Sequence, residues 1–180
     1  MSTILRLAAG AALLAVAFAA GAATYRNPAV ALEVPEGFEG PTVETPAPGA
    51  ETAAFVRRDP GSPVGALLQV TTQTFSSSPA AGMDPDRAAI TYLREFLGGI
   101  ERRRSGFAAS QPMMLEVDGH RMARANWTGN HGEVAMRGTM YALIVGDRLV
   151  VLHAQDLADP SRRHVEAAMR AIENLRVAAR

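Results

Sequence analysis

The chain has 180 residues with 18 basic and 18 acidic side chains, so its formal net charge at pH 7 is zero. Balanced charge provides no long-range field that would draw the protein to nucleic acid or to an anionic membrane surface. The sequence holds no cysteine, and every basic residue other than histidine is arginine. Disulfides, thiolate catalysis, Schiff-base lysines and the lysine of a phosphate-binding loop are therefore excluded.

The beginning of the chain has the layout of a secretory signal peptide. Arg6 precedes an apolar run at residues 7–20 that ends in an Ala-Gly-Ala triplet. A positive charge, a short apolar segment and an Ala-x-Ala end are the parts of a cleavable leader, and a membrane span needs about 20 strongly apolar residues. We predict a leader over residues 1–23, cleavage near Ala22 or Ala23, and a periplasmic or secreted location. An uncleaved leader would instead act as an anchor.

The remaining residues, 24–180, are expected to form a single domain that begins with short strands. Residues 31–35 and 53–58 read as strands, while the Pro- and Gly-rich residues 41–49 between them read as a loop. Residues 64–75 alternate more strictly, as a strand with one buried and one wetter face does. They divide into an apolar set and a polar set, Leu68, Val70 and Thr72 against Gln69, Thr71 and Gln73.

A helix is predicted after the serine-rich turn that follows. Asp84 supplies an N-cap carboxylate and Pro85 suits the first helical position. Apolar residues then recur at helical spacing and give one apolar stripe. They are Ala89, Leu93, Phe96, Leu97 and Ile100.

The second half of the chain predicts a four-stranded antiparallel meander and a closing helix. The strands are expected at residues 112–117, 120–128, 133–145 and 148–154, and the Asp118-Gly119 dipeptide is typical of a two-residue hairpin turn. Asp159-Pro160 repeats the helix-start pattern, and Val165, Met169, Ile172 and Leu175 give a second apolar stripe running almost to the end. The order predicts an α+β fold, an antiparallel sheet of about six or seven strands packed with two amphipathic helices.

Three segments carry a resemblance to a known family. Residues 32–38 read Leu-Glu-Val-Pro-Glu-Gly-Phe, Asp118-Gly119-His120 with Ala123 opens the central hairpin, and residues 167–177 form the closing helix. Together they resemble the PsbP-like family, which includes an extrinsic subunit of the photosynthetic oxygen-evolving complex and many small exported bacterial proteins. The resemblance implies an α/β sandwich, no shared catalytic residues, and a role in binding other proteins.

Several histidines, acids and methionines could bind a metal, but each could equally have a structural role. His153 and Asp156, with His120 or Asp118, have ligand types that suit zinc, but their spacing matches no metal motif. The methionines suit copper(I) in an exported protein, yet they lack Met-x-x-Met clustering and several fall on faces that must be buried. We therefore expect no metal and no cofactor.

The arginine runs can be interpreted as a binding patch or as solvated loops, and the sequence shows no catalytic motif. Arginines at residues 57–58, 102–104 and 162–163 could form a patch for an anionic partner, but neighbouring acids favour solvated loops. The sequence contains no Gly-x-Ser-x-Gly and no serine with a base at motif spacing. A hydrolase or metal enzyme is the third hypothesis.

Two binding hypotheses rank above an enzyme. The first is an exported, non-enzymatic accessory protein that contacts another envelope protein through Gln69, Thr71, Gln73 and Phe75, with the loop that runs on to Met83. The second is a module that binds a small apolar molecule between sheet and helix, near Met136, Met140 and Phe96, because methionine-rich surfaces repack around irregular shapes.

Overall fold

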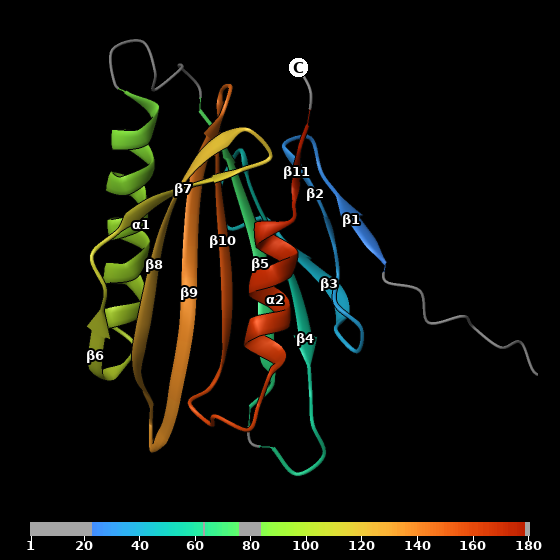
Figure 1. Cartoon of the computed structure of the whole chain (residues 1–180), viewed down its shortest axis with the longest axis vertical. Helices are drawn as coiled ribbons and strands as arrows, with labels where there is room; N and C mark the ends of the chain where they lie inside the picture. Colours follow the sequence, from blue (N-terminus) through green and yellow to red (C-terminus); the bar gives the residue numbers. More distant parts are fainter. Residues whose placement is uncertain (1–22, 63, 76–83, 179–180) are drawn as a thin grey trace, which may run out of the picture.

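The computed structural model describes residues 23–62, 64–75 and 84–178. In this part of the chain two helices pack against two antiparallel sheets (Figure 1). The larger sheet has eight strands in the order β3-β4-β5-β10-β9-β8-β6, with β7 also paired to β8, and the smaller has the order β1-β2-β11. The predicted α+β class is confirmed, while the leader boundary stays a prediction because residues 1–22 lie outside the described residues.

The first half of the described chain supplies two strands of the smaller sheet and three adjacent strands at one side of the larger sheet. The smaller sheet takes β1 (Thr24–Arg26) and β2 (Val30–Glu33), and the larger takes β3 (Glu39–Glu44), β4 (Ala50–Arg57) and β5 (Ala66–Thr74). The alternation predicted in β5 is confirmed. Leu68 and Val70 are buried on one face, and the glutamines on the other face are half-buried.

The predicted meander is confirmed by four consecutive antiparallel strands. They are β7 (Met113–Val117), β8 (His120–His131), β9 (Val134–Val145) and β10 (Arg148–Leu157). The turn between β7 and β8 needs two left-handed residues, and Asp118 and Gly119 adopt φ angles of 52° and 74°. Both are residue types that tolerate this backbone region, which is why the dipeptide indicated a tight hairpin.

Helix α1 (Pro85–Glu101) begins where the sequence predicted. The Asp84 carboxylate accepts a hydrogen bond of 3.0 Å from the backbone N–H of Arg87 and so satisfies one of the free donors of the first turn. Its buried residues include Ala89, Leu93 and Leu97, which pack against β8 and β9 on one face of the larger sheet.

Helix α2 (His164–Glu173) covers the opposite face of the larger sheet. Strand β10 shows this division, because Leu149 and Val151 belong to the core under α1 while Val150 and Leu152 belong to the core under α2. The small sheet packs into this second core (Figure 1). Among the described residues no helix is long and apolar enough to cross a membrane.

The predicted bounds of the second helix were wrong at both ends. The Asp159 carboxylate accepts hydrogen bonds from the backbone N–H and the hydroxyl of Ser161, which closes a turn, and the helix starts five residues after Asp159. At the other end, the Asn174 amide donates to the carbonyl of Arg170, and the helix stops there. The chain then forms β11 (Arg176–Val177), which pairs with β2.

Three further strands, β1, β3 and β6, were missed. The segment predicted as a loop at residues 41–49 contains most of β3, an edge strand whose pairing shifts between Glu39 and Thr42, around Pro41. An edge position tolerates proline because one side of the strand needs no ladder donor. Strand β6 (Ser105–Ala109) pairs with the far half of β8 and was hidden by its small residues.

A candidate binding groove beside helix α1

The larger sheet is too wide for a single helix to cover. A helix is about 10 Å across and neighbouring strands are about 4.8 Å apart, so one helix shields about two strands. Helix α1 lies over β8 and β9 and leaves the same face of β5 and β4, with the adjoining edge of β10, open. The result is an open cavity of about 740 Å³, called here the α1 groove.

Strand β5 forms the middle of the groove floor. The polar set Gln69, Thr71 and Gln73 points into the groove, as does Phe75 at the end of the strand. Gln69 donates to the Thr71 hydroxyl at 3.1 Å, and Thr71 in turn lies 3.0 Å from the hydroxyl of Thr52 on β4. These bonds pair some of the polar groups of the groove floor and fix the orientation of their side chains.

The helix side of the groove is mainly apolar. Tyr92, Phe96 and Ile100 line it along one side of α1, and Phe75 meets Tyr92 with ring centroids 5.6 Å apart. Met140 and Leu149 from the sheet, each 3 % exposed, complete the apolar surface. This surface is an extension of the core under α1 that the helix itself does not close.

A buried histidine lies in the floor next to the only tryptophan of the chain. The Trp127 indole donates a hydrogen bond of 3.2 Å to Nε2 of His153, which is 9 % exposed and lines the groove. Because indole can only donate, Nε2 must be the unprotonated nitrogen of the ring. Burial, helped by the charge of Arg104, lowers the pKa of His153 to about 4. At neutral pH the imidazole is therefore uncharged and carries its hydrogen on Nδ1.

Glycine makes room for this pair. Trp127 lies opposite Gly138 on β9, and a Cβ at that position would come within 2.6 Å of the indole ring. The indole is 2 % exposed as a result, and Phe107 of β6 stacks on it with centroids 6.2 Å apart.

One end of the groove is strongly basic. Arg102, Arg103 and Arg104 follow the last residue of α1 and line the groove there. The Arg104 guanidinium lies 5.9 Å from the centre of the Trp127 ring and 3.0 Å from Nδ1 of His131. The only carboxylate that lines the groove among the described residues is that of Glu95.

The metal hypothesis fails on strand geometry. His153 and Asp156 lie three positions apart on β10, so their side chains point to opposite faces of the sheet. Asp156 is fully buried against Arg162, with Oδ1 and Nη2 2.7 Å apart, while Asp118 binds Arg176 and the backbone N–H of Val177. Within the described ranges no three histidine or carboxylate side chains come together as a metal site would need.

Two of the three arginine runs meet at one acidic residue, and the third lies apart from them. Arg57 and Arg162 both lie near Asp59, which also contacts His164 at 2.9 Å, so their charges are balanced there. The run at residues 102–104 stands at the α1 groove instead.

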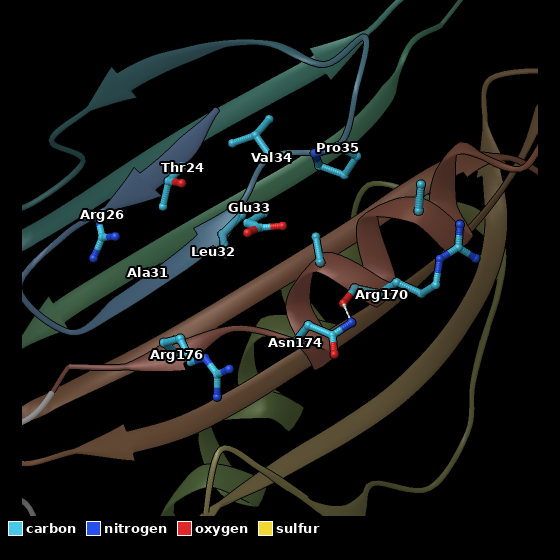
Figure 2. Close-up of a pocket in the computed structure, with 12 residues that line it drawn as sticks. Thr24, Arg26, Ala31, Leu32, Glu33, Val34, Pro35, Arg170, Asn174 and Arg176 are labelled. Atoms are coloured by element: carbon cyan, nitrogen blue, oxygen red, sulfur yellow. Dashed lines mark hydrogen bonds between the residues drawn. The ribbon is translucent and has the colours of Figure 1, made fainter. Parts of the chain in front are cut away.

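A second hollow, of about 560 Å³, lies between α2 and β2 (Figure 2). Arg26, Arg170 and Arg176 surround it, and Glu33 is the one carboxylate among its described lining residues. Its described lining holds no aromatic side chain, and Arg176 is already paired with Asp118 at 3.0 Å. The α1 groove is the better candidate because it joins an apolar wall to oriented polar groups.

Several residues singled out from the sequence line this groove. Gln69, Thr71, Gln73 and Phe75 share it, although their role as contacts stays a prediction, and the loop that was expected to extend the contact lies outside the described residues. Of the second hypothesis, Met140 and Phe96 line the groove, whereas Met136 is buried beneath α1. Sequence reasoning missed His153 and Arg104 as groove residues. Strand alternation puts His153 on the face of Leu149, but nothing local places Arg104 beside it.

Comparison with known proteins supports the architecture. No family model and no curated protein matches the sequence. Among solved structures, PsbP (CyanoP) from Synechocystis is similar over 94 % of this chain and 98 % of its own, with a TM-score of 0.62 at 11 % identity. The chain has the PsbP-like fold.

Two further solved structures are similar to this chain at comparably low identity. LpqN from Mycobacterium tuberculosis, described as involved in cell envelope biogenesis, aligns over 90 % of this chain and 88 % of its own, at 16 % identity and a TM-score of 0.54. A protein of unknown function from Pseudomonas aeruginosa aligns over 84 % of this chain and 94 % of its own, at 13 % identity and a TM-score of 0.49. At these identities the likeness to PsbP and LpqN shows the fold alone and leaves activity open.

Proposed function

We propose that this protein is an exported, non-enzymatic binding protein of the cell envelope, and that the α1 groove is its ligand site. The observation that carries the proposal is the groove itself, about 740 Å³ in volume with an apolar helix wall and a polar strand floor. Sites for small molecules are typically concavities of about 300–1,000 Å³, mostly apolar, with a few polar groups that orient the ligand.

The groups in the groove suit binding better than catalysis. The described lining contains neither serine nor cysteine, and its two threonine hydroxyls bond to each other. Its histidine has tryptophan as its partner, and a base in a catalytic triad is oriented by a carboxylate instead. The leader-like beginning of the sequence supports export, and the envelope role of LpqN supports an envelope location.

A contact with another envelope protein is the second candidate. It is favoured by Gln69, Thr71, Gln73 and Phe75, which are half-exposed and form one continuous surface from the floor to the end of the groove.

Native mass spectrometry of the protein purified from its host's exported fraction tests both candidates. Thr71→Phe fills the middle of the groove, and Thr42→Phe on the exposed edge strand β3 is the matched control. We expect a small organic adduct on the wild type and on Thr42→Phe but not on Thr71→Phe. A protein-sized adduct would favour contact with another envelope protein instead. A wild-type protein without any adduct would contradict tight binding of either kind.

A further inference from the structure

The charges around the α1 groove are unevenly placed. Three arginines line the end of the groove that follows α1, and Glu95 is the one carboxylate among the described lining residues. None of the three arginines lies within 4 Å of a described carboxylate, whereas Arg124, Arg137 and Arg162 elsewhere are paired. A guanidinium that is not already neutralised is an effective donor for a carboxylate or a phosphate group.

The other end and the helix side of the groove are apolar. Phe75 and Tyr92 pack together at the end near the start of α1, and Phe96 and Ile100 continue the surface toward the arginines. The apolar path therefore runs along the helix and ends at the positive charge. A ligand that matches this path has an elongated apolar part and a negatively charged group at one end.

His153 adds a neutral donor to the floor. Its Nε2 accepts from Trp127, so the hydrogen is on Nδ1, and Nδ1 makes no hydrogen bond to another described residue. The side chain lines the groove and is more than nine-tenths buried. An oxygen atom of a ligand in the groove would accept a hydrogen bond from this N–H.

We propose that the ligand of the α1 groove is a single-chain amphiphile with an anionic head, which binds at the arginines of residues 102–104 while the chain lies along α1. This inference rests on the proposed function and specifies the ligand class. Charge complementarity selects the head, and the exposed aromatic and aliphatic side chains select the chain.

The test compares probes that share a chain and differ in the head. Dodecanoate, dodecyl phosphate, dodecyl maltoside and dodecyltrimethylammonium are titrated below their micelle-forming concentrations, with calorimetry and the fluorescence of Trp127 as readouts. We expect the two anions to bind at least about tenfold more tightly than the other two, because a hydrogen bond to a charged group has about that effect. In a series of carboxylates, affinity should rise roughly fourfold for each CH₂ that is buried.

Variants then separate the head from the chain. Arg103→Gln combined with Arg104→Gln should weaken dodecanoate about tenfold and leave dodecyl maltoside nearly unchanged, while Arg94→Gln, on the exposed side of α1, should change neither. Equal binding of all four heads, or an equal loss in Arg94→Gln, would overturn the anionic ligand and leave the groove as a binding site. Failure of every probe to bind would instead contradict the groove as a small-molecule site.

Discussion

The indole of Trp127 donates a hydrogen bond to Nε2 of His153 across strands β8 and β10, at 3.2 Å. The bond fixes which nitrogen of the imidazole carries the hydrogen, and burial lowers the pKa of the ring to about 4. One pair of residues thus links the buried core under α1 to the floor of the groove. Its consequences reach stability, packing and binding.

Stability should fall as pH drops from about 6.5 to about 4. The pKa of His153 is about 4 in the folded protein and 6.5 for an ordinary histidine, so the unfolded chain binds the extra proton first. The loss is complete below the folded pKa and approaches about 3 kcal/mol, since a tenfold change in proton affinity corresponds to about 1.4 kcal/mol. Urea unfolding at pH 7 and pH 4.5 measures it. In His153→Gln, which keeps an acceptor for the indole, this part of the pH dependence should disappear, and an unchanged pH profile would contradict the assignment.

The carboxyl groups with lowered pKa values affect stability at lower pH, so they do not obscure the effect of His153 between about pH 4 and pH 6.5. Hydrogen bonds lower the pKa of three carboxyl groups below the ordinary value of 3.8: chiefly from His164 to Asp59, from the backbone of Val177 to Asp118, and from the side chain of Ser161 to Asp159. Their contribution is present above pH 3.8 and is lost as pH falls through their folded pKa values.

Gly138→Ala should destabilise the protein and disturb Trp127. The added methyl group would lie 2.6 Å from the indole and 2.7 Å from the carbonyl oxygen of Ala154, and overpacking of this kind costs about 1–3 kcal/mol. Gly98→Ala on α1 meets no atom closer than 3.8 Å and should instead stabilise by about 0.5–1 kcal/mol. Thermal unfolding together with Trp127 emission distinguishes the two. The packing argument fails if both variants change stability in the same direction.

Removing Arg162 should be among the most damaging single changes. Asp156 is fully buried, and Arg162 is its close partner at 2.7 Å. Arg162→Met leaves an uncompensated buried carboxylate, which typically costs about 3–5 kcal/mol, and Asp156→Asn in the same chain should restore part of the loss. Arg163→Met, whose side chain is 76 % exposed, should change the free energy of unfolding by less than about 0.5 kcal/mol. A cost for Arg162→Met no larger than this control would show that the pair is not closed in solution.

Glu95→Gln should strengthen the binding of anionic amphiphiles. The Glu95 carboxylate lines the groove that the arginines make positive, so its removal deletes a repulsive charge. A nearby charge that is partly exposed to solvent changes the affinity for a charged ligand by about two- to fivefold at low salt. Glu101→Gln on the same helix, outside the groove lining, is the control. Calorimetric titration with dodecanoate at two salt concentrations measures the difference; weaker binding by Glu95→Gln would contradict the proposed head position.

Local chemistry explains what the sequence predicted about the fold. Asp84 with Pro85 and Asp118 with Gly119 are short patterns whose geometry depends only on neighbouring residues, and the structure contains both. The start of α2 depended on distant partners, because Arg162 binds Asp59 and Ser62 from far earlier in the chain, besides the buried Asp156, and is not placed in a helix. Strands β3, β6 and β11 are specified by the strands they pair with, and their own sequences are weak in alternation.

Only the part of the candidate site that depends on local sequence patterns could be predicted from the sequence. Alternation along β5 showed that Gln69 and Thr71 share a face, and that information is local. The groove above them exists because α1 packs over β8 and β9, where small residues such as Ala123 and Ala125 allow close approach. Which strands a helix covers is a tertiary result, so neither the hollow nor the position of Arg104 could be read from spacing.

Methyl NMR of the methionines tests the central claim, that the α1 groove binds the ligand, most directly. Met140 lines the groove, while Met113 on β7 is 62 % exposed and does not. With methyl-labelled methionine and increasing dodecanoate, the Met140 signal should shift saturably, and the Met113 signal should stay in place. A Met140 signal that does not move, or a shift confined to Met113, would contradict the groove as the binding site.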